Sequence, residues 1–209
     1  MDFKEERREV ARFMRRAYNL KLTTTSGGNF SRRVGDGLIA VTPSQLDKGR
    51  MRGRQVALMD LRGNNLTPDL KISSEGRMHL RIYQEHAHIG AIVHAHPVTA
   101  SAFCCAETPI RHDLLAEQYC LMQAPLVVPY AMTSSDALAE QVVAYAGKAP
   151  CLIMENHGVT TTGATLLQAF DRLELLEIAA RLTLMMPRLE GVRALTDEQK
   201  RELDALMGR

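Results

Sequence analysis

Two histidines one residue apart, His94 and His96, close an apolar run from Ile89 to Val93 that predicts a buried strand. Because alternate side chains of a strand leave on the same face, both imidazoles point the same way, about 7 Å apart by strand rise. Pro97 ends the strand and leaves the pair near its end. This spacing makes the two residues candidate metal ligands, whereas a single histidine there would be an ordinary packed residue.

A third histidine, His157, follows the apolar run Cys151 to Met154 and precedes Gly158, which permits a close backbone approach. Alone, His157 is more simply a surface or packing residue. Together with His94 and His96 it supplies the three ligands of a catalytic zinc site, which keeps a fourth position open. A structural zinc site is the alternative, but it usually has four protein ligands and favours cysteine.

Glu75 is the candidate acid or base of the same site. It follows Ser73 and Ser74 at the start of a predicted helix, where the helix dipole favours a negative charge. A metal-assisted reaction needs a carboxylate that can move a proton. The alternative is an ordinary glutamate in a first helical turn. The four other histidines are interpreted as ordinary residues of helices and loops: His79, His86, His88 and His112.

Three clusters of small residues are candidates for binding a phosphate: Gly27-Gly28-Asn29, Thr42-Pro43-Ser44 and Ser73-Ser74. Each offers hydroxyls or free backbone N–H groups at a loop or helix start. Any turn contains such residues, so no cluster is specific by itself. Because the chain has neither a GxxxxGK[ST] loop nor a GxGxxG motif, we do not expect nucleotide binding.

The bulk properties predict a single cytoplasmic domain. The chain has 209 residues and a formal net charge of +2, with acidic and basic residues interleaved, which argues against a nucleic-acid surface. The charged N-terminal segment does not resemble a signal peptide, and charges interrupt the longest apolar stretch, 166–186, so no membrane span is expected. The four cysteines lack metal-type spacing and are interpreted as reduced thiols.

Short strands and helices alternate along the chain, which predicts a layered α/β fold. Strands are expected at 30–34, 38–41, 55–61, 70–72, 89–93, 126–128, 151–154 and 159–162. Helices are expected at 2–20, 73–88, 98–105, 110–122, from a cap at 133–136, at 166–186 and at 196–207. Gly35-Asp36-Gly37 predicts a hairpin turn between the first two strands.

Six stretches, in order and at matching spacing, resemble the class II aldolase family, which also includes the adducin head domain. They cover roughly Met1 to Met186 and are Gly27–Ser31, Thr42–Ser44, Ser73–Glu75, His94–Pro97, Pro129–Ala131 and Glu155–Gly158. The resemblance implies a three-layer α/β/α fold with a mixed, largely antiparallel central sheet. It implies one domain, 1–209, with 188–209 as a C-terminal tail.

The resemblance also assigns roles to the candidate residues. It implies a zinc ion held by His94, His96 and His157, with Glu75 near or on the metal; manganese or cobalt would suit the same ligands. It implies a site for the substrate phosphate built from Gly28, Asn29, Thr42, Ser44, Ser73 and Ser74. A C4 homotetramer with active sites at the subunit interfaces is expected.

The implied activity is that of a metal-dependent aldolase. It would cleave a ketose 1-phosphate, such as L-fuculose 1-phosphate, to dihydroxyacetone phosphate and an aldehyde. Epimerases of the family resemble Ser-Ser-Asp followed by Thr-Pro-Thr-His, so Glu75 followed by Gly76 favours the aldolases. Tyr119 is the nearest candidate for the proton-donating tyrosine of a neighbouring subunit, although its spacing to Pro129 is shorter than in the family, and no tyrosine follows Tyr145.

Two classes of alternative stay open. An epimerase, dehydratase or decarboxylase acting on a phosphosugar would share the metal and phosphate residues and differ on the aldehyde side. A non-catalytic interaction module of the adducin kind has no need of metal ligands, and the three histidines together with Glu75 argue against it.

Overall fold

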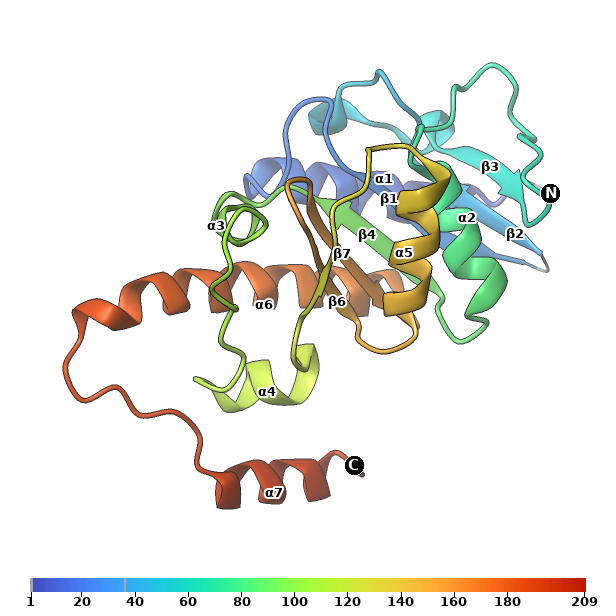
Figure 1. The fold of residues 1–209 in the computed structure, drawn as a ribbon. Helices are drawn as coiled ribbons and strands as arrows, with labels where there is room; N and C mark the ends of the chain where they lie inside the picture. Colours follow the sequence, from blue (N-terminus) through green and yellow to red (C-terminus); the bar gives the residue numbers. More distant parts are fainter. Residues whose placement is uncertain (1, 36) are drawn as a thin grey trace.

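The computed structural model describes residues 2–35 and 37–209, and there a seven-stranded mixed sheet lies between two layers of helices (Figure 1). The strand order is β3-β2-β1-β4-β7-β6-β5, antiparallel except for the parallel pair β5 and β6. The strands are β1 (Asn29–Val34), β2 (Leu38–Val41), β3 (Ala57–Asp60), β4 (Ala91–Ala95), β5 (Leu126–Val128), β6 (Cys151–Met154) and β7 (Gly158–Gly163). The predicted three-layer α/β/α fold with a largely antiparallel sheet is confirmed.

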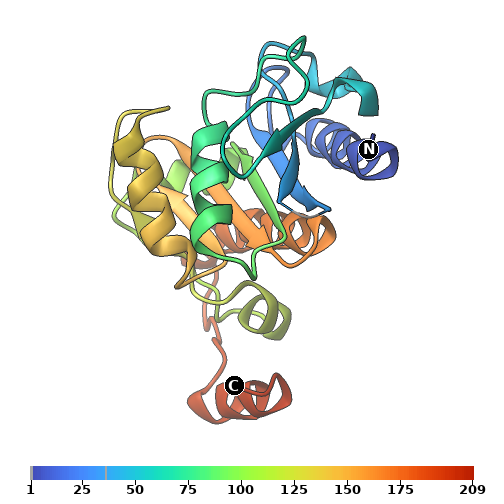
Figure 2. The same ribbon diagram turned by 90° about the vertical axis from the view of Figure 1, so that its right-hand side faces the viewer.

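The helices cover both faces of the sheet (Figure 2). They are α1 (Lys4–Asn19), α2 (Gly76–Glu85), α3 (Val98–Phe103), α4 (Ala116–Met122), α5 (Asp136–Ala146), α6 (Leu166–Met185) and α7 (Asp197–Leu206), with short 3₁₀ turns at η1 (Lys48–Arg50), η2 (Gly53–Gln55) and η3 (Met186–Arg188). One apolar core joins α1, α3 and α6 to one face of the sheet, and a second core joins α2 and α5 to the other. None of the described helices is long and apolar enough to cross a membrane.

The central strand β4 carries residues of both cores in alternation. Ala91 and Val93 pack against the layer of α1 and α6, and Ile92 packs against the layer of α2 and α5. His94 therefore leaves β4 on the α2 side, as the two-residue period requires. Its partners across the strand are Asn29 on β1 and Thr160 on β7, so the middle of the sheet positions His94 from both sides.

Two predicted elements depart from the structure by more than small shifts of their ends. The helix expected over 110–122 begins only at Ala116, and the segment before it is bonded to α6 through the Arg111 amide, which donates to the Thr183 hydroxyl at 2.9 Å. The strand expected over 70–72 is a single bridge between Ile72 and Pro43, since proline has no N–H with which to continue a ladder. The hairpin pairing of β1 with β2 is present, although Asp36 in its turn lies outside the described residues.

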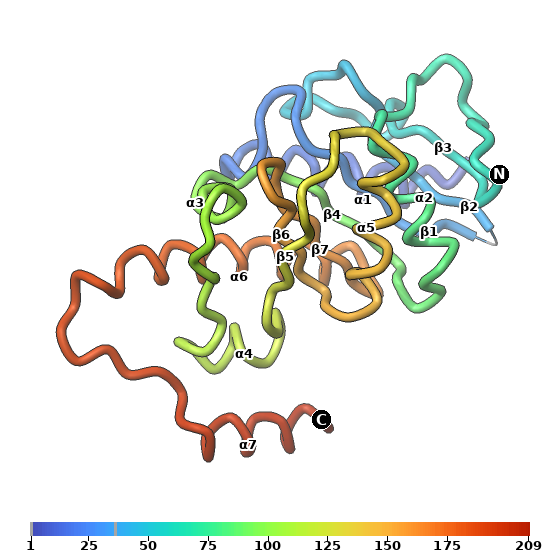
Figure 3. The backbone as a smooth tube through the Cα atoms, viewed as in Figure 1, coloured from blue at the N-terminus to red at the C-terminus, as the bar shows by residue number. Residues whose placement is uncertain are grey.

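The last part of the chain leaves α6 and returns as α7 beside α4 (Figure 3). Thr196 caps α7 by accepting a hydrogen bond from the Gln199 amide at 3.2 Å. The helix buries none of its residues. It is held instead by polar contacts, among them Arg209 to the carbonyls of Tyr119 and Cys120.

Candidate metal centre

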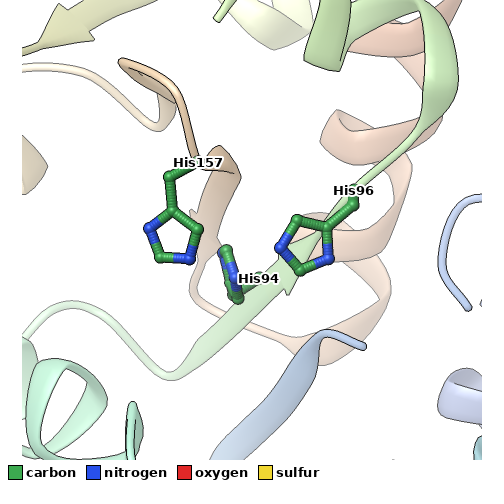
Figure 4. A group of neighbouring side chains, drawn as sticks. All are labelled: His94, His96 and His157. Atoms are coloured by element: carbon green, nitrogen blue, oxygen red, sulfur yellow. The ribbon is translucent and has the colours of Figure 1, made fainter. Parts of the chain in front are cut away.

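The three predicted histidine ligands converge at one point, at the end of the central strand (Figure 4). His94 belongs to β4, His96 lies just past its end, and His157 lies in the turn between β6 and β7. One ring nitrogen of each lies within 4.8 Å of the others, and the ring centroid of His94 is 4.7 Å from that of His96 and 4.9 Å from that of His157. This is a spacing at which a single cation can be shared by three imidazoles.

The hydrogen bonds of His94 leave one nitrogen free to act as a ligand. Nδ1 lies 3.0 Å from the carbonyl oxygen of Val159 and 3.3 Å from the Thr160 hydroxyl. A carbonyl only accepts, so Nδ1 carries the hydrogen and Nε2 keeps its lone pair. Nε2 is buried without a hydrogen-bond partner among the described residues. Burial also lowers the pKa of His94, which favours the neutral form that metals bind. The residues therefore fit a metal ion.

His96 fits its place because two neighbouring positions are glycine. A Cβ on Gly158 would lie 2.5 Å from Cδ2 of His96, and one on Gly27 would lie 3.3 Å from its Nδ1. The close approach predicted at Gly158 is therefore made by the His96 ring, which occupies the space that a side chain at position 158 would fill. Asn156 has a left-handed φ of 53° in the turn that presents His157, a conformation that asparagine tolerates.

Glu75, the residue before α2, directs its carboxylate at the histidines. Its Oε1 lies 2.7 Å from Nε2 of His157, and its Oε2 lies 3.3 Å from Nε2 of His94. The Asn29 amide donates to the same Oε2 at 2.5 Å. Burial by itself raises the pKa of Glu75, but His94, His157 and Asn29 outweigh it and hold that pKa below its usual range. The predicted acid or base is thus an anion placed among the predicted metal ligands.

The six predicted phosphate residues lie on three adjoining loops. Asn29 is also 3.4 Å from the Ser73 hydroxyl, and the Ser44 amide donates to the carbonyl of Lys71 at 2.9 Å. Gly28 has a φ of +66°, and a Cβ there would lie 2.7 Å from the carbonyl oxygen of His94. Ser74 is exposed beside these residues. We call this set of loops, 23–29, 42–44 and 71–75, the candidate phosphate cradle.

Thr42, the sixth predicted phosphate residue, is fully buried. Its hydroxyl accepts a hydrogen bond from the Phe30 amide at 3.0 Å. The contact joins the end of β2 to β1 at the first residue of the 42–44 loop.

Tyr119, the predicted proton donor, is not brought to the histidines of its own chain. It lies on α4, where its hydroxyl donates to Asp204 of α7 at 2.9 Å and its ring stacks on His112. The hydrogen bond to Asp204 raises the pKa of Tyr119 and so favours its protonated form. In Figure 1, α4 and α7 lie together at the lower side of the molecule, whereas β4 runs upward toward α3.

Sequence reasoning missed two features beside the site. His79, interpreted as an ordinary helical residue, is fully buried, and its Nδ1 lies 2.6 Å from the Ser31 hydroxyl, which lies 2.8 Å from that of Tyr83. The spacing of His79 and Tyr83, four and eight residues after Glu75, is the signal that places them on one helix face. Lys48 is buried beneath the cradle, and no pattern in the neighbouring sequence predicts that burial.

Comparison with known proteins agrees with this geometry. Residues 8–184 match the family model of the class II aldolase and adducin N-terminal domain. The chain is 31% identical over 191 residues to a 3-oxo-tetronate 4-phosphate decarboxylase of Haemophilus influenzae, covering 90% of each chain. It is 32% identical over 186 residues to an L-fuculose phosphate aldolase of Methanococcus maripaludis, covering 87% of this chain and 98% of that protein.

A solved structure shares the architecture. An L-fuculose 1-phosphate aldolase superposes with a TM-score of 0.88 and 25% sequence identity, over 98% of this chain and 97% of that one. The match extends over the sheet and the helices that carry the histidines and Glu75. By its sequence and its fold, the chain belongs to the class II aldolase and adducin N-terminal domain family.

Proposed function

We propose that the chain is a metal-dependent aldolase that cleaves a ketose 1-phosphate, such as L-fuculose 1-phosphate, to dihydroxyacetone phosphate and an aldehyde. The observation that carries this proposal is the placement of Glu75, whose two carboxylate oxygens lie 2.7 Å from His157 and 3.3 Å from His94. A group that can move protons and a set of metal ligands thus share one site. An interaction module would have no use for such a site.

Three imidazoles would hold the metal: His94, His96 and His157. Zinc is the metal we propose, and manganese or cobalt would suit the same ligands. When bound, the ion supplies Lewis-acid polarisation of the substrate carbonyl. The carbonyl of Val159 and the hydroxyl of Thr160 orient His94, as outer-shell hydrogen bonds do in metal sites.

Glu75 is the proposed acid–base residue, acting at the substrate carbon next to the carbonyl. In cleavage a base takes the proton of the C4 hydroxyl, the C3–C4 bond breaks, and its electron pair moves toward the carbonyl. The Glu75 carboxylate takes up a proton and delivers it to C3, so that the one proton lost from the C4 oxygen is matched by the one gained at C3 and no further reactant is consumed. Asn29, which donates to Glu75, holds the carboxylate in place for that transfer.

The candidate phosphate cradle would bind the substrate phosphate. Gly28, Asn29, Ser44, Ser73 and Ser74 offer amide and hydroxyl donors on three adjoining loops, a pattern suited to an anion. Thr42, the sixth residue proposed for this site, is held at the start of the 42–44 loop by its hydrogen bond with Phe30.

A C4 homotetramer completes the proposal, because Tyr119 would have to act in the site of a neighbouring subunit. Support for it comes from the family resemblance and from the position of Tyr119 away from Glu75 in its own chain. The molar mass of the chain in solution tests it, since any mass other than four chains contradicts this assembly. We place the enzyme in the cytoplasm, which suits its four free cysteines.

Decarboxylation of a phosphorylated sugar acid is the second candidate activity. The Haemophilus influenzae relative is a decarboxylase of this kind, and the Tyr119 hydroxyl is already engaged by Asp204. Loss of carbon dioxide also breaks a bond next to a carbonyl and leaves a carbon that Glu75 can protonate. It releases no aldehyde and therefore needs no tyrosine on that side.

One assay separates the two activities. The enzyme is incubated with a panel of ketose 1-phosphates, with L-ribulose 5-phosphate and with 3-oxo-tetronate 4-phosphate, each with and without chelator. Release of dihydroxyacetone phosphate that is abolished by chelator and restored by zinc is the expected result. Release of carbon dioxide alone supports the decarboxylase, and turnover that persists in chelator contradicts a metal-dependent enzyme.

A further inference from the structure

Lys48 is a buried cation beneath the candidate phosphate cradle. Its exposed fraction is 1%, and it is the single buried lysine or arginine among the described residues. Its ammonium donates to the carbonyl oxygen of Pro43 at 2.7 Å. An ammonium has three hydrogens to donate, so one neutral carbonyl uses only part of its capacity. Burying a charge is costly unless it is compensated, which makes the position of Lys48 informative.

The backbone around Lys48 joins two loops of the cradle. The Lys48 amide donates to the carbonyl of Thr25 at 2.9 Å, while the side chain holds Pro43. The next residue, Ser44, is in turn bonded to Lys71 of the third loop. The ammonium is therefore buried against the 42–44 loop, one of the three loops proposed to receive a phosphate. It is also near enough to Glu75 for that charge to oppose the lowering of the pKa of Lys48 by burial.

The charges of the site explain why a cation is useful there. The donors proposed to face the phosphate are neutral hydroxyls and amides. Glu75 contributes one negative charge, which the proposed divalent metal ion at the histidines would more than balance. A phosphate ester adds a charge of about −1.5 to −2 near neutral pH. Because none of the proposed cradle donors is charged, a cation buried against the 42–44 loop supplies an attraction for the phosphate that these donors lack.

We propose that Lys48 is a positioning residue that gives the cradle its preference for phosphorylated substrates, by holding the 42–44 loop through Pro43 and by setting a positive charge behind it. The inference rests on the proposed function. It assigns to Lys48 the discrimination between a sugar phosphate and the same sugar without phosphate. Lys48 has no part in the proton transfer, which belongs to Glu75.

The test compares inorganic phosphate binding in four full-length proteins: wild type, Lys48→Met, Lys48→Arg and Arg50→Met. Methionine has a similar length and suits a buried site, whereas arginine keeps the charge. Arg50 lies on the same 3₁₀ turn with a side chain that is 91% exposed, so its replacement removes the same charge outside the cradle. Metal content and the far-UV circular dichroism spectrum are matched before titration calorimetry.

We expect Lys48→Met to weaken phosphate binding about 10- to 100-fold, the range expected when a charged hydrogen-bonding group is lost. Arg50→Met should stay within about twofold of wild type, and Lys48→Arg should restore part of the affinity. In turnover, KM for the phosphorylated substrate should rise by a similar factor while kcat changes little. A purely structural defect would lower kcat and folding stability instead.

The outcomes separate this inference from the proposed function. If Lys48→Met binds phosphate as wild type does, or if wild type binds none, the role of Lys48 is wrong even where sugar cleavage is observed. If phosphate binding depends on Lys48 but no dihydroxyacetone phosphate or carbon dioxide is released from any substrate, the proposed function is wrong and the phosphate site stands.

Discussion

Glu75 and His157 are joined by a contact of 2.7 Å between Oε1 of the carboxylate and Nε2 of the imidazole. The two residues come from distant elements, the start of α2 and the turn between β6 and β7. Their contact places the candidate proton-transfer group directly beside a candidate ligand. A carboxylate there can stabilise the histidine cluster and can also reach a substrate bound at it, which is why the two roles should be separable by substitution.

Replacing Glu75 by glutamine should separate metal binding from turnover. The amide retains the shape of the side chain and an oxygen that can accept from Asn29, but it cannot take up a proton. We expect metal content to be unchanged and kcat to fall about 10²- to 10⁴-fold, the usual contribution of a general acid or base. Elemental analysis and a steady-state assay measure the two effects.

Glu85→Gln is the matched control, because Glu85 is an exposed residue at the other end of α2. It should leave both quantities unchanged. Full activity in the Glu75→Gln protein would remove Glu75 from the mechanism, and loss of the metal would make it chiefly a ligand.

Replacing His157 by asparagine should weaken metal binding without unfolding the chain. His157 lies in a turn, and the fold around it is carried by β6 and β7. With one of three imidazoles lost, the zinc affinity should fall at least 100-fold, as measured by competition with a chromogenic chelator. His88→Asn, a change of an exposed histidine, is the control and should bind zinc as wild type does. Equal affinities in both variants would mean that the metal lies elsewhere.

Much of the site could be predicted from the sequence because its residues lie on short, regular elements. The two-residue period of a strand places His94 on the α2 face next to Asn29, and the apolar run before His157 predicts β6 correctly. The strand expected to end at Val93 continues to Ala95, since pairing with β7 extends to that residue. Family and fold were predicted correctly because several short motifs occur in a fixed order.

The rest depends on contacts between segments that no local pattern encodes. Lys48 lies between Asp47 and Gly49, a composition typical of an exposed turn, and only the packing of η1 beneath the cradle buries it. Ile110 continues the apolar period of α4, but the chain there packs against α6 with a bond from the Arg111 amide to Thr183, and α4 begins only at Ala116. Tyr119 has the right residue type for a proton donor, yet its hydroxyl is held by Asp204, far along the chain.

Replacing Ser31 by alanine should destabilise the fold by disrupting the buried contact between β1 and α2. The Ser31 hydroxyl lies 2.6 Å from His79 and 2.8 Å from the Tyr83 hydroxyl, and all three residues are buried. Alanine would leave two buried polar groups without that partner, at about 1–3 kcal/mol each. We expect urea unfolding to show a loss of about 2–6 kcal/mol. Ser26→Ala, in an exposed loop, should cost less than about 0.5 kcal/mol.

The dependence of stability on pH should reveal the burial of Lys48. Burial lowers the pKa of Lys48 to about 8, from an ordinary value of 10.5. Between these two values the unfolded chain holds a proton that the folded chain has released, so this group makes folding more favourable as pH rises. Between pH 7 and pH 10.5 the unfolding free energy of wild type should therefore increase by about 3 kcal/mol relative to that of Lys48→Met.

Arg50→Met is again the control, because it removes an exposed side chain and leaves the buried ammonium of Lys48 in place, so its difference from wild type should not change with pH. Urea unfolding at a series of pH values measures both differences. If the stability difference from wild type stays constant with pH for Lys48→Met, as it should for Arg50→Met, the Lys48 ammonium is hydrated in the folded protein.

Removal of residues 189–209 should leave the rest of the domain folded. No residue of this tail is buried, and α7 is held by surface contacts such as Tyr119 with Asp204 and Lys200 with Asp113. Each exposed contact contributes at most about 1 kcal/mol. The loss of each such contact should therefore lower the thermal midpoint by at most about 2–4 °C. Calorimetry on the chain truncated after Arg188 gives the measurement. The absence of a cooperative unfolding transition in the truncated chain would show that the tail is part of the domain core. A truncated chain that is stable but has a changed kcat would indicate that α7 acts on Tyr119.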